Sequence, residues 1–195
     1  MRPAFALTDP AALAEVISAA PLASVVSQGP EGLQVSHLPL HLRGGRLVGH
    51  VARNNPLLRR ERSPRPRSRR AADGYVSPSL YPGKPEHGRV VPTWNYVVAH
   101  AHGALKAIDD PAWIRAQLEA LTDSREGARE HPWAVGDAPA DYLGKMLRAI
   151  VGIEIAIARL EGVRKASQNR EERDRASVKA AFTASPEGEA MARWM

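Results

Sequence analysis

The sequence contains no cysteine among its 195 residues. This absence excludes disulfide bonds, thiolate metal sites and catalysis by a thiol. No apolar run approaches the roughly 18–20 residues that a membrane-spanning helix needs. The first residues read MRPAFALTDP, in which one arginine is followed by a polar break, so they do not resemble a signal peptide. We therefore expect a cytoplasmic protein.

Several motifs that carry chemistry are also missing. No Gly-x-Ser-x-Gly elbow occurs, which argues against a Ser-His-Asp hydrolase, and the glycines form neither a phosphate-binding loop nor a Rossmann fingerprint. His100 and His102 share one face of a predicted strand, but no carboxylate at a ligand-like spacing accompanies them. We therefore predict no metal site and assign no catalytic residue. We also find no internal repeat and no convincing helix-turn-helix.

Charge of one sign is concentrated in a single segment. The net charge is +6, yet residues 59–70, RRERSPRPRSRR, contain seven arginines and one glutamate, so that 20 of the 27 basic and 20 of the 21 acidic residues remain elsewhere. An arginine cluster of this kind is typical either of an arm that binds nucleic acid or of a solvated loop without a partner. Because the segment has no apolar residue to fill one face of a sheet, we expect it to form no strand and to lie outside the fold.

Caps and periodicity predict the other elements. The helix that starts at Asp9-Pro10 and the helix that starts at Asp109-Asp110-Pro111 each have an acidic N-cap before a proline. The remaining expectations are strands at 22–27, 33–42, 46–52 and 94–108, a helix at 141–149 with Tyr142, Met146 and Ile150 on its inner face, a strand from Val151 with alternating isoleucines, a turn at Gly162 with a short return at 163–166, and a helix at 171–182.

Many short antiparallel strands with a few helices between them predict a mainly β fold with helices, of the α+β class. The simplest arrangement is a small antiparallel β-barrel with peripheral helices, in one domain over residues 1–182 and with a frayed C-terminal tail at 183–195.

The segment from Tyr75 to Tyr96, YVSPSLYPGKPEHGRVVPTWNY, is the most informative part of the chain. It has too many prolines for a plain strand, because each proline removes a ladder donor. It also places Trp94, which we expect to be buried, among small polar side chains. One interpretation is a rigid wall that presents hydroxyls and an amide to a small ligand, and the other is a proline-rich hairpin packed on the core.

The motifs SPSLYP, VPTWNY, SHLPLHL, GHVARNNP, APADYLGKMLRAIVGIEI and SQNR occur in an order and spacing that resemble the PaiB family, over about residues 3–178. The resemblance implies the split β-barrel of FMN-binding proteins, a homodimer with FMN at the subunit interface, and a role as an FMN-binding negative transcriptional regulator. Against this pattern residues 59–72 stand out as an Arg/Pro/Ser-rich insert or as a segment shifted by a reading-frame slip.

An FMN site needs donors for a phosphate, amide and backbone groups for the ring edge, and apolar cover for the ring face. Strand ends and turns offer polar candidates, and the resemblance favours the sets around Ser77, Thr93 and Gln168. The candidate contacts are Ser36, His37, Leu38, Pro39, His50, Ala52, Arg53, Asn54, Ser77, Ser79, Lys84, Thr93, Trp94, Asn95, Gln168, Asn169 and Arg170. Leu80 replaces a tryptophan that is frequent in the family, so aromatic stacking is lost there and apolar contact is kept.

Three functions remain open at this point. The family resemblance implies a repressor, and DNA is a partner by that resemblance alone. The alternatives are a small flavin-dependent oxidoreductase of the split-barrel class, because flavin itself carries the redox chemistry, and a flavin-binding sensor without catalysis.

Overall fold

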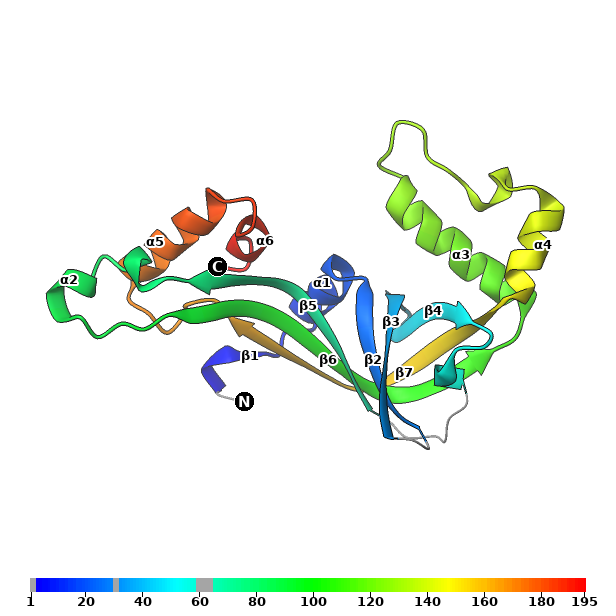
Figure 1. Cartoon of the computed structure of the whole chain (residues 1–195), viewed down its shortest axis with the longest axis horizontal. Coiled ribbons are helices and arrows are strands. Elements are labelled where there is room, and N and C mark those ends of the chain that lie inside the picture. Colours follow the sequence, from blue (N-terminus) through cyan, green and yellow to red (C-terminus); the bar gives the residue numbers. More distant parts are fainter. Residues whose placement is uncertain (1–2, 30–31, 59–64) are drawn as a thin grey trace. The chain divides into compact units, whose positions relative to one another are not determined.

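The computed structural model describes residues 3–29, 32–58 and 65–195. Within these residues the chain forms seven strands and six α-helices, together with four short 3₁₀ helices (Figure 1). The strands are β1 (Ala6–Leu7), β2 (Leu22–Gly29), β3 (Gly32–Arg43), β4 (Arg46–Ala52), β5 (Arg65–Val76), β6 (Thr93–Ile108) and β7 (Ile150–Lys165). The helices are α1 (Pro10–Ala19), α2 (Lys84–His87), α3 (Pro111–Glu126), α4 (Ala140–Arg148), α5 (Glu172–Thr183) and α6 (Glu189–Ala192), and the 3₁₀ helices are η1 (Pro3–Phe5), η2 (Pro56–Leu58), η3 (Pro78–Leu80) and η4 (Val135–Asp137).

The strands form one sheet in the order β1-β7-β4-β3-β2-β5-β6. β6 also pairs with β7, so the sheet closes on itself. The ladders β1–β7, β2–β3, β3–β4 and β4–β7 are antiparallel. The expected α+β fold with an antiparallel sheet is therefore confirmed.

Contacts divide the chain into two compact units. Unit 1 contains Met1–Ala20, Ser68–His100 and Leu160–Met195, and unit 2 contains Pro21–Arg67 and Ala101–Arg159. Each of β5, β6 and β7 contributes residues to both units. The expectation of one domain over residues 1–182 stays a prediction.

The core of unit 2 lies against the inner faces of β2, β3, β4 and β7. Val25, Leu47 and Ile153 are completely buried there, and each stabilises the fold by about 1.5–3 kcal/mol. Helix α3 begins at the predicted cap, where Asp110 accepts hydrogen bonds from the backbone of Ala112 and Trp113, and it packs on β4.

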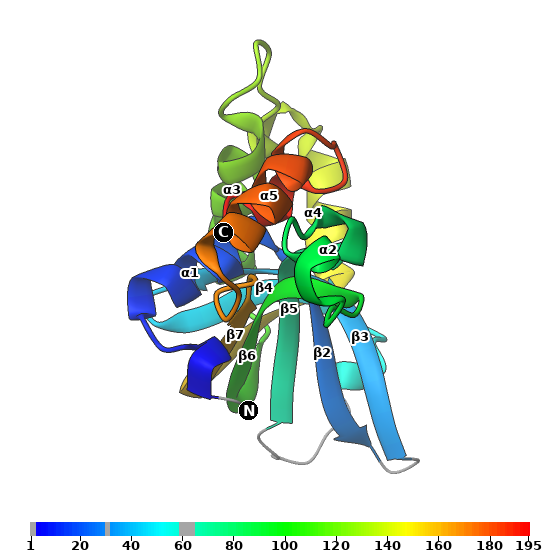
Figure 2. The ribbon, with the colours of Figure 1, turned by 90° about the vertical axis from the view of Figure 1, so that its left-hand side faces the viewer.

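The core of unit 1 is formed by helices that cover β-strands. Helix α1 is capped by Asp9, as predicted, and buries Leu13, Val16 and Ile17. Phe182 of α5 packs over Gly74 of β5, where an added Cβ would lie 2.7 Å from the phenyl ring. Figure 2 shows α2 beside the start of α5, where Arg173 forms a bidentate ion pair with Glu86.

Part of the arginine-rich segment lies in the sheet. Residues 65–70 belong to β5, which lies between β2 and β6 in the strand order, so the expectation that they form no strand is wrong. A strand needs paired backbone groups, and neighbouring strands supply partners for a charged segment as well, although Pro66 offers no N–H to the ladder. Residues 59–64 lie outside the described part of the chain. The interpretation of residues 59–72 as an insert or as a reading-frame slip stays a prediction.

The expected turn at Gly162 is also wrong, because β7 continues through it to Lys165. Gly162 pairs with Leu7 of β1, and an added Cβ would lie 2.5 Å from the side chain of Leu13. The glycine therefore allows close packing and does not make a turn. The C-terminal tail is not frayed either, because α6 buries Met191 completely.

Three side chains are more exposed than their sequence pattern predicts. Trp94 is 52% exposed, although we expected it to be buried. Tyr142 and Met146, expected on the inner face of α4, are 53% and 43% exposed. No residue of α4 is buried, so the helix has no inner face within the described part of this chain. In the described ranges, no helix combines the length and apolar character that crossing a membrane requires.

Candidate functional site

A polar hollow of about 530 Å³ lies in unit 2 beside β3. One side is formed by Gln34, Val35, Ser36 and His37 of β3, and the other by Asn55 and Pro56 at the start of η2. The register explains the opening. β4 pairs with β3 at Leu40–Arg43, so the earlier part of β3 extends beyond that ladder toward the chain that leaves β4.

The β3 side of the hollow contains two predicted contacts, Ser36 and His37. The imidazole Nδ1 of His37 lies 3.1 Å from the hydroxyl oxygen of Ser24, its register partner on β2. This hydrogen bond orients the ring. Leu38 is buried in the core, with 6% exposure, and Pro39 is half-buried. Because the side chain of Leu38 is buried, only its backbone is available to a ligand.

The opposite side of the hollow is built by Asn55, which the sequence analysis missed by one residue. Its side-chain oxygen accepts a hydrogen bond from the backbone of Leu57 over 2.8 Å, and its own backbone donates to Ala52 over 2.9 Å. The oxygen is committed to this turn, so a side-chain hydrogen bond to a ligand would come from the amide nitrogen. Asn54, the predicted residue, is exposed. An Asn-Pro pair is a turn signal, and this signal identifies Asn55.

His50 faces the helix α3. Its Nδ1 lies 3.1 Å from Oε1 of Gln117, whose side chain is completely buried between α3 and the sheet. Gln117 Nε2 has no hydrogen-bond partner in the part of the chain that the structure describes. A contact between His50 and a ligand stays a prediction, and so does one at the exposed Ala52.

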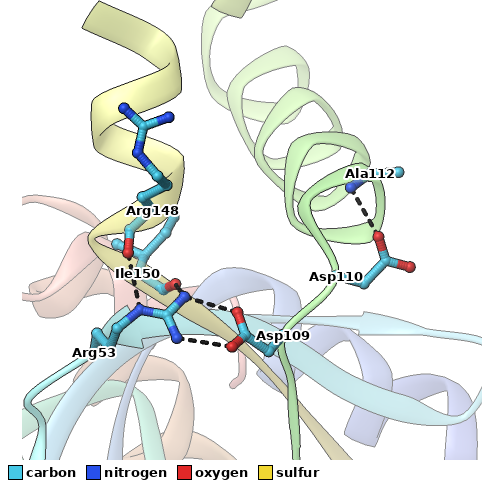
Figure 3. A network of polar contacts seen from close by, with 6 residues as sticks. All are labelled: Arg53, Asp109, Asp110, Ala112, Arg148 and Ile150. Atoms are coloured by element: carbon cyan, nitrogen blue, oxygen red, sulfur yellow. Dashed lines mark hydrogen bonds and ion pairs between the residues drawn. The ribbon is translucent and has the colours of Figure 1, made fainter.

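Arg53 is held in a network of protein acceptors (Figure 3). Its Nη1 and Nη2 donate to the two carboxylate oxygens of Asp109 over 2.8 and 2.7 Å. Its Nε donates to the backbone oxygen of Arg148 over 2.8 Å, and Nη2 also donates to that of Ile150 over 3.1 Å. The hydrogen bond from Arg53 lowers the pKa of Asp109 below its ordinary value, and the same bond raises the pKa of Arg53. The network occupies the guanidinium that we predicted to contact FMN.

In unit 1, the Tyr75–Tyr96 segment presents two aromatic rings at its surface. Tyr75 and Trp94 are about half exposed and pack edge to face, with ring centroids 5.9 Å apart and an interplanar angle of 66°. Beside Trp94, the hydroxyl of Thr93 accepts a hydrogen bond from Lys165. Ser77 caps η3, and its hydroxyl lies 2.8 Å from that of Ser79. Lys84 is exposed at the start of α2.

Asn95 points into the protein. Its side chain is completely buried, and Nδ2 donates to the hydroxyl oxygen of Ser167 over 2.9 Å. Ser167 is itself buried and has a φ of 58°, and no other non-glycine residue in the described ranges has a positive φ. Such a conformation costs free energy and persists because the surroundings hold it. This pair holds the SQNR turn in place.

The rest of that turn is also held by the protein. The side-chain oxygen of Gln168 accepts a hydrogen bond from the backbone of Ala166, and its nitrogen donates to the backbone oxygens of Ala4 and Arg164. Arg170 lies over the ring of Tyr81, 4.9 Å from the centroid. Asn169 is exposed. A ligand contact from these residues stays a prediction.

The arrangement in unit 2 suits non-covalent binding. The hollow offers a hydroxyl, an imidazole and carboxamides, and its size lies within the range of small-molecule sites. Within the residues that the structure describes, no group of three or more histidine or carboxylate side chains is arranged to hold a metal ion.

Known proteins resemble the chain in sequence. Residues 1–159 match the family model described as "Putative FMN-binding domain". An uncharacterized protein of Emericella nidulans is 38% identical over 118 residues, which are 55% of this chain and 47% of that protein. A protein of Saccharomyces cerevisiae is 32% identical over 108 residues, or 50% of this chain and 63% of that protein. The chain thus matches about half of the length of its curated relatives.

Two solved structures share the fold. A protein of Mycobacterium smegmatis that binds FAD and heme aligns with a TM-score of 0.64 at 22% identity, over 88% of this chain and 79% of its own. A flavocytochrome of Azotobacter vinelandii aligns with a TM-score of 0.65 at 19% identity, over 88% of this chain and 75% of its own. At these identities the similarity concerns the fold, and it confirms the predicted split-barrel class.

Proposed function

Because the chain belongs to the FMN-binding domain family, we propose that it binds FMN and that the hollow beside β3 forms part of the binding site. The observation that carries this proposal is the meeting of Ser36 and His37 with Asn55 and Pro56 around one polar hollow. Residues from the two sequence blocks SHLP and ARNNP line it together. The two solved proteins that share the fold are described as a FAD-binding protein and a flavocytochrome, which supports a flavin as the class of ligand.

The residues of the hollow suit the different parts of FMN. The hydroxyl of Ser36, the ring of His37 and the amide nitrogen of Asn55 are hydrogen-bonding groups for the ribityl chain, the phosphate or the ring edge. Val35 and Pro56 supply apolar contact. Bound FMN would supply redox chemistry, whereas the protein residues bind and orient it.

A second copy of the chain is the partner that we propose for the outer face of the β2–β3 hairpin. Leu22, Leu33 and Val35 on this face are 63%, 65% and 56% exposed, and the register places Val26 opposite Val35. Val35 also lines the hollow, so the apolar face is continuous with it. An exposed apolar patch of this kind is typical of an interaction surface. A homodimer would cover both the apolar face and the hollow.

The biological role that we propose is that of an FMN-binding negative transcriptional regulator in the cytoplasm. This role is supported by the resemblance to the PaiB family. DNA as a partner rests on the same resemblance. A flavin-dependent oxidoreductase is the alternative that the flavin itself supports, and a sensor without catalysis is a further one. Two assays separate these functions. Reduction of the bound flavin by a nicotinamide cofactor would support the oxidoreductase, and gel retardation of a DNA fragment from the gene's own promoter region would support the regulator.

Flavin binding is tested by adding FMN to protein purified without flavin. We expect the fluorescence of FMN to be quenched with a stoichiometry of about one FMN per chain. Riboflavin and FAD in parallel titrations show whether the terminal phosphate is recognised. Fluorescence that remains unchanged at millimolar protein would overturn the proposal.

A further inference from the structure

We propose that Arg53 and Asp109 form a clamp that positions the Asn55–Pro56 side of the hollow, so that Arg53 acts as a positioning residue and does not contact the FMN phosphate. This inference rests on the proposed function for its binding test. Its structural content concerns the protein alone.

The side chain of Arg53 joins three junctions of unit 2. The residue follows β4 directly, Asp109 lies between β6 and α3, and the two carbonyl groups belong to the end of α4 and the start of β7. The backbone nitrogen of Arg53 adds a bond to the oxygen of Ala149 over 2.9 Å. Figure 3 shows the guanidinium between the aspartate and these carbonyl groups. The chain that leaves β4 is therefore fixed at Arg53 by both side chain and backbone.

The hydrogen bonds also match the chemistry of the partners. A guanidinium and a carboxylate form two parallel bonds in one plane, which defines orientation as well as distance. The last carbonyl groups of a helix lack intrahelical partners and carry partial negative charge, so a cation at Arg148 O caps α4. A lysine cannot reproduce this pattern, because its ammonium group is a point donor without a planar fork.

The clamp lies two residues from the hollow. Asn55 is tied to Ala52 through its backbone and to Leu57 through its side chain, so Arg53 lies inside a tight turn that begins at Ala52. Movement of Arg53 is therefore transmitted to Asn55. An isolated ion pair with side chains 47% and 64% exposed would contribute little, but here the pair is bidentate and shares its arginine with two carbonyl groups.

The clamp and a phosphate contact predict different ligand preferences. FMN and riboflavin differ only in the phosphate, so a lost phosphate contact weakens FMN alone and only in the Arg53 variant. A displaced Asn55 weakens binding in the Arg53 and Asp109 variants alike. The variants are Arg53→Ala, Asp109→Ala and the double variant, with Arg46→Ala as the matched control. Arg46 forms an exposed ion pair with Glu154 over 2.9 Å at the other end of β4.

We expect Arg53→Ala and Asp109→Ala to weaken FMN binding by the same factor, about tenfold, and the double variant to be no weaker than either, because the two residues act as one unit. Arg46→Ala should bind as the wild type does. A selective loss of FMN in Arg53→Ala, with Asp109→Ala unchanged, would overturn the clamp and make Arg53 a phosphate ligand. Arg53→Lys, which we expect to behave as Arg53→Ala, serves if the alanine variant does not fold.

Hydrogen exchange of the flavin-free protein gives a second measurement that needs no ligand. The amides of Asn55, Leu57 and Leu58 donate within this turn, and we expect them to exchange faster by about tenfold or more in both clamp variants but not in Arg46→Ala. Unchanged exchange would overturn the clamp. If the wild type binds neither flavin, the proposed function fails, while exchange still decides whether the clamp positions the turn.

Discussion

Asn95 and Ser167 form a hydrogen bond of 2.9 Å between two buried side chains that lie 72 residues apart in the sequence. The bond joins β6 to the turn that follows β7, and it holds Ser167 at a φ that favours glycine. We expected Asn95 to face a ligand, whereas its side chain holds the SQNR turn. The polar side chains of this motif therefore have a structural use.

The first prediction concerns this pair. Ser167→Ala removes the oxygen acceptor of Asn95 Nδ2 and leaves it only the weak sulfur acceptor of Met195, so we expect the free energy of unfolding to fall by about 1–3 kcal/mol. Ser167→Gly loses the same bond but relieves the backbone, by about 1 kcal/mol. Urea unfolding should therefore rank the wild type above the glycine variant and the glycine variant above the alanine variant. An alanine variant as stable as the glycine variant would show that the positive φ carries no strain.

The second prediction concerns Gly103, whose backbone lies close to a neighbouring strand. A Cβ added at Gly103 of β6 would lie 1.9 Å from the backbone oxygen of Ala156 of β7. Because a backbone atom cannot move aside as a side chain does, we expect Gly103→Ala to lower the free energy of unfolding by roughly 3 kcal/mol or more. Gly136→Ala, where no atom lies within 4 Å, is the matched control. Equal thermal stability of the two variants would contradict the pairing of β6 with β7 here.

The third prediction concerns acid stability. Hydrogen bonds from Arg173 and Arg53 lower the pKa values of Glu86 and Asp109. A carboxyl whose pKa is lower in the folded state contributes stability above its unfolded pKa and loses this contribution as the pH falls through the folded value. We therefore expect the free energy of unfolding to decrease from about pH 5 downward. Unfolding of Glu86→Gln and Asp109→Asn over the same pH series should show a shallower decrease, and an unaltered slope would contradict this origin.

The caps and the strand patterns of this fold could be predicted because their signals are local. Asp110 before Pro111 specifies the start of α3, and the alternating isoleucines from Val151 specify β7. Gly162 was misread because its reason, the close packing of β1 and α1, lies far away in the sequence. Trp94 and Asn95 of β6 were misread for a related reason. Alternation along a strand shows that neighbouring side chains face opposite sides, but it does not show which side is buried.

At the hollow, two of the predicted segments meet in the structure, whereas single side chains differ from the prediction. Ser36 and His37 do line the hollow, but Asn55 takes the place predicted for Asn54. Arg53 was predicted as an FMN contact because it follows a strand end, and its carbonyl and carboxylate partners come from distant elements that no local pattern reveals.

The fourth prediction concerns the proposed homodimer. Lysine at Leu22 and Leu33 would place two charges on the apolar face of the β2–β3 hairpin, and neither residue lines the hollow. We expect the wild type to be a dimer by light scattering and Leu22→Lys/Leu33→Lys to be a monomer, because an unpaired charge in an apolar interface is costly. Val91→Lys, at another exposed aliphatic residue with 65% exposure, should remain dimeric. A monomeric wild type that still binds FMN at one per chain would contradict the dimer.

The most direct test of the central claim is an FMN titration of a variant altered only in the hollow. Ser36→Ala/Asn55→Asp removes a hydroxyl and an amide donor while it keeps the oxygen that caps η2, and Asn54→Ala alters the exposed neighbour. We predict that the wild type and Asn54→Ala bind FMN alike, and that the double variant binds it about 10–100-fold more weakly, because two hydrogen bonds are lost and the new carboxylate repels an anionic ligand. Binding by the double variant as tight as that of the wild type would contradict the placement of FMN at the hollow.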